Sequence, residues 1–233
     1  MTPPLIKLNQ VSKKYLNQTA LTNITFQLTK SGIYGVIGPN GSGKTTLLKI
    51  MAGLLRSSKG TVEIMEKPVT RLSSQHIAFL SEADSLYSFQ TVNQMVDFCH
   101  NVMPDFSKDK ALNMIQSLNI EKDKKIKHLS KGNRARVKIV LTLSRQVPVL
   151  LMDEPLSGLD PLVREDILRM IVMNVDVEEQ ILVLSTHEVS EVEPFLDHVI
   201  FMKNGTCLLE KSVEQLREEK GQSVVEAMRE VLS

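Results

Sequence analysis

The fold of this chain is decided by the stretch Gly38-Pro39-Asn40-Gly41-Ser42-Gly43-Lys44-Thr45. It fits the pattern G-x-x-x-x-G-K-[ST], in which glycines let the backbone turn with its N–H groups pointing inward. Residues 33–37 before it form an apolar strand, and residues 45–55 after it carry apolar side chains at helical spacing. An ordinary glycine turn is the alternative, but the strand, the lysine and the hydroxyl together favour a loop that binds phosphate groups.

The chemistry of this loop predicts a bound nucleotide. The helix that follows would add the positive end of its dipole. Lys44 would reach the β- and γ-phosphate oxygens, and the hydroxyl of Thr45 would ligate Mg²⁺.

A second apolar run, residues 149–152, ends in two carboxylates, Asp153 and Glu154. Such an ending is rare without a cation or a catalytic duty, because an unpaired carboxylate beside a dry sheet is costly. Asp153 is predicted to hold Mg²⁺ through water, opposite Thr45. Glu154 is predicted to polarise the attacking water as a general base. A solvated strand end is the alternative.

A single histidine, His187, follows a third apolar run at residues 181–184. A lone histidine is usually structural or simply exposed. At the carboxyl end of a parallel strand, however, it lies where ligands bind, and its imidazole is predicted to donate to the γ-phosphate.

Apolar spacing predicts the remaining elements. The predicted strands are residues 5–11, 20–28, 33–37, 61–64, 77–80, 149–152, 181–184 and 199–202. The predicted helices are residues 45–55, 91–102, 107–118, 130–145 and 161–174. This alternation predicts one α/β domain over residues 1–233 with a largely parallel sheet. Residues 91–147 are expected to form a helical sub-lobe inserted between core strands, and residues 212–233 a helical extension.

Composition narrows the classes of function. Lysine and arginine total 28 against 27 acidic residues, a net charge of +1, which gives no support to a nucleic-acid binder. Cys99 and Cys207 lack metal-type spacing and are predicted to be two buried thiols. Neither a signal peptide nor a membrane-spanning run is recognisable. The chain is therefore expected to be cytoplasmic and to reach a membrane through a partner.

Further motifs make the chain resemble the ABC ATPase family from about residue 5 to residue 209. Leu129-Ser130-Lys131-Gly132-Asn133 looks like the family's signature loop. Ser157-Gly158-Leu159-Asp160 resembles its D-loop, and His187 its switch histidine. Tyr15 stands where the family has an aromatic side chain that stacks on adenine.

The resemblance implies a phosphate-loop NTPase core with a mainly parallel sheet, an N-terminal antiparallel β sub-lobe and the inserted helical sub-lobe. It implies ATP and Mg²⁺ as cofactors, and it implies a head-to-tail pair in which each ATP lies between two subunits. The nucleotide-binding residues would be Tyr15, Gly38, Pro39, Asn40, Gly41, Ser42, Gly43, Lys44, Thr45 and Thr46, with Ser130, Lys131 and Gly132 acting in trans.

Two motifs depart from the family pattern, at three positions. The signature loop has Lys131 for a glycine and Asn133 for a glutamine. The second departure lies outside the signature loop, after residues 77–80. There the family usually has a glutamine, and this chain has Glu82, which is predicted to ligate Mg²⁺ with Thr45 and Asp153. A basic stretch is interpreted as a solvated face around the signature helix, with an electrostatic role towards nucleotide or an acidic permease loop as the alternative. Its members are Lys122, Lys124, Lys125, Lys127, Lys131, Arg134, Arg136 and Lys138.

These motifs are compatible with three functions. A transporter motor that hydrolyses ATP beside a separate transmembrane permease, peripheral on the inner face of the membrane, is favoured because no DNA-handling segment accompanies the cassette. An ABC ATPase acting on DNA or ribosomes is the second, and a regulatory subunit that senses ATP without turnover is the third. Homodimer or heterodimer, import or export, and the substrate all stay open.

Overall fold

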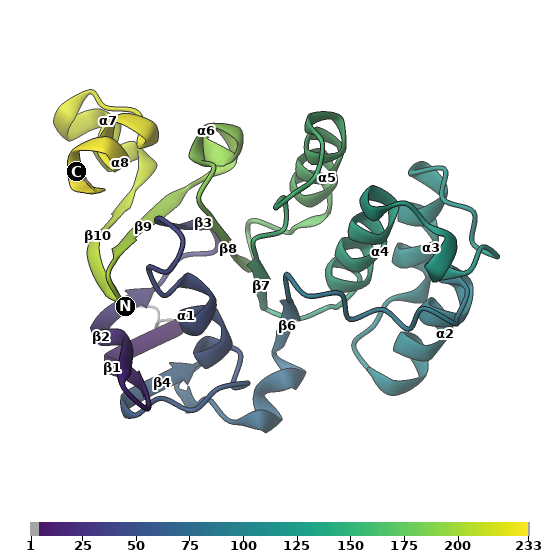
Figure 1. Ribbon diagram of the computed structural model, residues 1–233, viewed down its shortest axis with the longest axis horizontal. Helices are drawn as coiled ribbons and strands as arrows, with labels where there is room; N and C mark the ends of the chain where they lie inside the picture. Colours follow the sequence, from purple (N-terminus) through teal and green to yellow (C-terminus); the bar gives the residue numbers. More distant parts are fainter. Residues whose placement is uncertain (1–4, 233) are drawn as a thin grey trace.

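Helix α1 (Lys44–Met51) packs between two β-sheets in the computed structural model, which describes residues 5–232 (Figure 1). Leu47, Leu48 and Met51 on this helix are fully buried. They belong to one apolar cluster with side chains from both sheets. Burial of this helix from two sides fixes the glycine loop that precedes it.

The larger sheet has six strands in the order β10-β9-β3-β8-β7-β6. Their bounds are β3 Gly32–Ile37, β6 Ile77–Leu80, β7 Val149–Asp153, β8 Ile181–Thr186, β9 His198–Lys203 and β10 Thr206–Ser212. Neighbours from β9 to β6 are parallel, and β10 is antiparallel to β9. Every residue of β3, β7 and β8 is buried, as parallel strands covered on both faces require. The glycine loop, Asp153 and His187 therefore meet at one edge of this sheet.

The smaller sheet is antiparallel, in the order β2-β1-β4-β5. Its strands are β1 Ile6–Tyr15, β2 Gln18–Leu28, β4 Lys59–Ile64 and β5 Lys67–Pro68. Strand β1 continues four residues past the predicted range 5–11, and β2 begins two residues before the predicted range 20–28. Their pairing continues as far as Tyr15 and Gln18, because cross-strand bonds outweigh the polar composition of this tip.

Three helices, α2 (Val92–Val102), α3 (Lys108–Ser117) and α4 (Lys131–Leu143), contact one another at one end of the molecule (Figure 1). Each begins at a hydroxyl side chain that accepts a backbone N–H: Thr91, Ser107 and Ser130, respectively. The predicted helices 91–102, 107–118 and 130–145 are confirmed to within two residues at each end, whereas the helix predicted over residues 45–55 already ends at Met51. A short 3-10 turn, η2 (Ile126–His128), leads into α4.

The remaining helices are α5 (Pro161–Asn174), α6 (Val189–Val192), α7 (Val213–Lys220) and α8 (Val224–Leu232), with 3-10 turns η1 (Arg71–Gln75) and η3 (Glu193–Phe195). Helix α8 contacts β9 and α6 and buries Val224 and Ala227. Helices α7 and α8 lie within the stretch where the sequence predicts a helical extension.

The fold class predicted from the sequence is confirmed: a mainly parallel sheet, an antiparallel β-sheet and a group of helices. Within residues 5–232 we find no helix whose length and apolar character suffice to cross a bilayer. Both cysteines are free, Cys99 buried as predicted and Cys207 only half-buried. Burial raises the pKa of both thiols to about 11.

Candidate functional site

The glycine loop joins β3 to α1, and two of its positions leave no room for a side chain. A Cβ on Gly38 would lie 2.2 Å from the carbonyl oxygen of Met202, and one on Gly43 would lie 2.8 Å from that of Ala20. Gly43 also has a φ of 104° and is the N-cap of α1. Only glycine follows this path without strain, so the loop reaches Lys44 in one defined shape.

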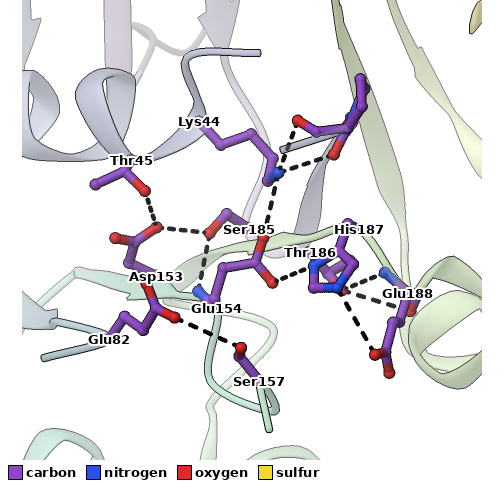
Figure 2. A network of polar contacts seen from close by, with 12 residues as sticks. Lys44, Thr45, Glu82, Asp153, Glu154, Ser157, Ser185, Thr186, His187 and Glu188 are labelled. Carbon is purple, nitrogen blue, oxygen red and sulfur yellow. Dashed lines mark hydrogen bonds and ion pairs between the residues drawn. The ribbon is translucent and has the colours of Figure 1, made fainter. Parts of the chain in front are cut away.

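The ammonium group of Lys44 points back into its own loop. It donates to the carbonyl oxygens of Gly38 (2.8 Å) and Pro39 (3.3 Å), and it forms an ion pair with Glu154 at 3.2 Å (Figure 2). Its side chain is only 5% exposed. A buried ammonium group at the start of a helix is well placed to meet phosphate oxygens.

The carboxylate of Asp153 lies at the end of β7 and is 1% exposed. One of its oxygens accepts hydrogen bonds from the hydroxyls of Thr45 and Ser185, each at 2.9 Å (Figure 2). The chain thus brings Thr45 and Asp153 together from residues 108 positions apart.

Oxygen donors at this point fit a hard cation. A threonine hydroxyl and a buried carboxylate meet here, and Glu82 lines the same cleft. Carboxylates, waters and substrate phosphates are the donors that magnesium takes in nucleotide sites. Among residues 5–232 no three histidine, cysteine, aspartate or glutamate side chains gather in a metal-binding cluster. The protein therefore offers part of a coordination shell, which the phosphates of a nucleotide would complete.

The backbone of Glu154 is in the left-handed region, with a φ of 47°. For a residue other than glycine this conformation costs about 1–3 kcal/mol and persists only where neighbours hold it. The hydroxyl of Ser185 does so, accepting the Glu154 N–H at 2.9 Å. The turn aims the carboxylate of Glu154 into the cleft, between Lys44 and His187 (Figure 2).

His187 follows β8 and places its Nδ1 2.9 Å from a carboxylate oxygen of Glu154. Its Nε2 lies 3.7 Å from Glu188. The ring is about one-third exposed, at 35%. A histidine so held between two carboxylates presents an edge to the cleft in a fixed orientation.

The segment after β6 carries Glu82 on the opposite side of the cleft. The hydroxyl of Ser157 lies 3.5 Å from the Glu82 carboxylate (Figure 2). The backbone of this segment is held by Lys138 of α4, whose ammonium group donates to the carbonyl oxygens of Ser81, Glu82 and Ala83.

A cleft of about 620 Å³ joins these residues. Its lining includes Tyr15, Asn40, Gly41, Gly43, Lys44, Thr45, Thr46, Glu82, Glu154 and His187 from the predicted set. Tyr15 is half-exposed at its rim, and the ammonium group of Lys13 lies 5.1 Å from the centre of the ring. Such a cleft is large enough for a nucleotide.

The predicted trans residues Ser130, Lys131 and Gly132 do not line this cleft. Ser130 caps α4, and a Cβ on Gly132 would lie 2.9 Å from Val163. The ammonium group of Lys131 donates to the carbonyl oxygen of Gly158 in the same chain at 2.7 Å. Lys131 instead lines a neighbouring cleft that shares Glu82, Glu154 and Ser157 with this one.

Other residues of the cleft were not predicted. The hydroxyl of Ser185 forms hydrogen bonds with both Asp153 and Glu154. The sequence indicates only that Ser185 lies at the end of the apolar strand before His187. Asn204 and Gly205 line the cleft from the turn between β9 and β10. Both have positive φ, and Asn-Gly between two strands is a strong hairpin signal. That signal would have revealed both the turn and the missed strand β10.

Comparison with known proteins identifies the family of this chain. A family model described as "ABC transporter" matches residues 21–157, more than half of the chain. The chain belongs to the ABC transporter family. It is an ATP-binding and ATP-hydrolysing subunit of a transporter, as the motifs predicted. ATP-binding subunits of this family dimerise and work with transmembrane components.

Curated ABC relatives align over nearly the whole chain. The uncharacterized ABC transporter ATP-binding protein MJ1023 of Methanocaldococcus jannaschii is 31% identical over 91% of this chain and 79% of its own length. The ABC transporter ATP-binding protein YtrB of Bacillus subtilis is 27% identical, over 92% and 74%. The lantibiotic transport ATP-binding protein SrtF of Streptococcus pyogenes is 29% identical, over 90% and 92%.

Solved ABC cassettes share the fold. An ATP-binding subunit of an ABC transporter superposes with a TM-score of 0.85 at 23% identity, covering 98% of this chain and 100% of the other. A dimeric post-hydrolysis state of the cassette MJ0796 bound to ADP and Pi has a TM-score of 0.78 at 24% identity, covering 89% and 98%. The predicted phosphate-loop core of an ABC ATPase is thereby confirmed.

Proposed function

We propose that this ABC subunit binds Mg²⁺–ATP in the cleft beside the glycine loop and hydrolyses it with Glu154 as the general base. The observation that carries the proposal is the position of the Glu154 carboxylate. It lies 3.2 Å from the Lys44 ammonium group and 2.9 Å from His187, in a turn held by Ser185. A carboxylate fixed this way beside a phosphate-binding lysine can accept a proton from an attacking water.

Binding would use each part of the cleft differently. Adenine would stack on the exposed face of Tyr15, and the phosphates would enter the loop from Gly38 to Thr46. Thr45, Asp153 and Glu82 would hold the magnesium ion, which neutralises charge on the phosphates. The hydroxyl of Ser42 is buried and has no hydrogen-bond partner within the described part of the chain, so it is available to a phosphate oxygen.

Hydrolysis would follow from an exchange of partners at Lys44. Phosphate oxygens would replace Glu154 as the anionic partner of the lysine. The freed carboxylate would then orient water towards the γ-phosphate and take its proton. In its doubly protonated form, His187 would keep Nδ1–H on Glu154 and turn Nε2–H from Glu188 to the γ-phosphate.

A second cassette would supply the signature-loop residues that this cleft lacks. Two subunits would pair head to tail, with Ser130, Lys131 and Gly132 of each facing the nucleotide of the other. The N-terminus of α4, a helix of 13 residues, would then point its dipole at that γ-phosphate. Residues 91–147 would move as a helical lobe of the single cassette. A transmembrane permease would bind the pair at the inner face of the membrane and convert its opening and closing into transport.

The experiment that tests this function is the oligomeric state of Glu154→Gln, measured by light scattering with and without Mg²⁺–ATP. We expect monomer without nucleotide and dimer with it, because the variant binds ATP but cannot release the pair by hydrolysis. The matched control, Glu154→Gln with Lys44→Ala, should stay monomeric. A variant that binds ATP and stays monomeric contradicts self-pairing, and one that binds no ATP contradicts the assignment of the cleft.

A further inference from the structure

One lysine outside the nucleotide cleft has an unusual set of partners. The ammonium group of Lys138 donates to three successive carbonyl oxygens, those of Ser81 (2.6 Å), Glu82 (3.1 Å) and Ala83 (2.8 Å). An ammonium group has three N–H donors, so all of them are used on one loop. The loop thus curls round the end of this side chain.

Lys138 belongs to a basic row on one face of α4. Lys131, Arg134 and Lys138 are spaced three and four residues apart, which aligns them along the helix. Arg134 forms an ion pair with Asp84, and Lys131 donates to the carbonyl oxygen of Gly158. The basic row therefore contacts the loop that carries Glu82 and Asp84 and also the loop that carries Gly158.

A second cleft, of about 400 Å³, separates the Glu82 loop from α4. Ser81, Glu82 and Asp84 line one side of it, and Lys131, Arg134 and Lys138 line the other. Polar contacts from α4 hold the loop from Ser81 to Asp84, and Leu86 further along packs against the apolar core. Lys138 is half-buried, and burial lowers its pKa while the charge of Glu82 acts to raise it.

From these contacts we infer that Lys138 is a positioning residue that holds the Glu82 loop to the signature helix. The inference rests on the proposed function, in which Glu82 faces the magnesium ion and Ser130 the partner's nucleotide. Lys138 stands two turns after the N-terminus of α4. It therefore joins the loop that approaches this chain's own nucleotide to the helix that approaches the other one.

The tests compare Lys138→Met with Lys110→Met in the full chain. Lys110 is the matched control because it lies on α3, is half-buried with a pKa lowered by burial, and donates to the carbonyl oxygen of Asn174 at 2.8 Å. It does not line the nucleotide cleft. Methionine keeps the length and the apolar stem of each lysine but removes the donor.

The first readout is cleavage after Glu82 by a glutamate-specific protease, without nucleotide. Glu82 is exposed, so the rate reports how readily its loop opens. Lys138→Met removes several charge-assisted hydrogen bonds, and we expect cleavage at least about tenfold faster. Lys110→Met, and cleavage after the exposed Glu121, should match the unchanged protein. Equal cleavage in the two lysine variants would overturn the inference.

The second readout is a double-mutant cycle on ATP turnover with Glu82→Ala. Lys138→Met alone should lower kcat about 10- to 100-fold through misplacement of Glu82, with KM for ATP changed less than about threefold. In the Glu82→Ala background the same substitution should have little further effect. Additive losses would overturn the inference. If Lys138→Met folds poorly, Lys138→Arg serves instead; it keeps the charge but its planar donors fit three converging carbonyls less well, so an intermediate effect is expected.

The two proposals fail in different ways. Unchanged turnover in Glu154→Gln would contradict the proposed function but leave the cleavage result standing. Unchanged cleavage in Lys138→Met would contradict the role of Lys138 and leave Glu154 as the base.

Discussion

The glycine loop and the Glu82 loop face the same cleft but are held by different contacts. Backbone hydrogen bonds hold the glycine loop. The Ser42 N–H donates to the carbonyl oxygen of Pro39, and the Gly205 N–H from the β9–β10 turn donates to the carbonyl oxygen of Ser42. Residues 82–86 make no backbone–backbone hydrogen bond within the described residues 5–232. Side chains of Arg134 and Lys138 hold them instead. The glycine loop is thus rigid in itself, whereas the position of the Glu82 loop follows that of α4.

The largest effect is expected at Glu154, where the two sides of the cleft meet. Glu154→Gln should lower turnover by about 10²–10⁴-fold, since a general base contributes on this scale. ATP affinity should stay close to that of the unchanged protein. Steady-state ATPase assays measure the loss, with the exposed Glu165→Gln as control. Turnover that is preserved would remove Glu154 as the base.

The next largest effect is expected in the glycine loop, for Lys44→Ala. Loss of its charge-assisted hydrogen bonds should weaken ATP binding by about 100-fold. Titration with a fluorescent ATP analogue measures this, and Lys49→Ala on the same helix is the control. Undiminished binding would refute the phosphate-loop assignment.

Ser185→Ala should show how far the acidic strand end depends on one hydroxyl. Its removal leaves the Glu154 N–H without its acceptor and Asp153 with only one of its two hydroxyl donors, so the free energy of unfolding should fall by about 1–3 kcal/mol. Turnover should fall as well, because the left-handed turn at Glu154 loses its support. Urea unfolding and ATPase assays together measure the two effects. Ser117→Ala, which removes a hydroxyl bonded within α3, should affect neither to this extent.

The smallest effect is expected for Lys131→Met. This lysine is exposed and makes one bond to Gly158, so its loss should change stability by less than about 1 kcal/mol. Its effect on turnover separates two roles. A change below about threefold agrees with a contact within its own chain, whereas a loss as large as that of Lys138→Met would indicate a direct contact with the nucleotide in trans.

Sequence alone predicted the parts of the site that are local. The glycine loop occupies eight consecutive residues, and its backbone needs glycine where no Cβ fits, so the pattern carries the shape. Asp153 and Glu154 stand directly after an apolar strand, and the parallel sheet places that strand end beside Thr45. These predictions depend only on short stretches of chain and on the order of strands.

The rest depends on contacts between distant residues. The interpretation of Arg134, Arg136 and Lys138 as a solvated face was wrong, because each of them bonds a partner 30 or more positions away. Charge and spacing on a helix cannot tell such a residue from one that faces water. Ser185 was missed for the same reason: its partners lie on a neighbouring strand.

The turn at Asn204 and Gly205 has a consequence for the order of events during synthesis. Gly205 donates to Ser42 of the glycine loop and accepts from Thr22 of β2. The strand that carries the loop, β3, pairs only with β8 and β9, both made after residue 180. The glycine loop at residues 38–45 is synthesised well before β8, β9 and the turn at Gly205, which contact the loop or its strand. A chain truncated before β8 would therefore carry the complete motif without the strands that pair with β3.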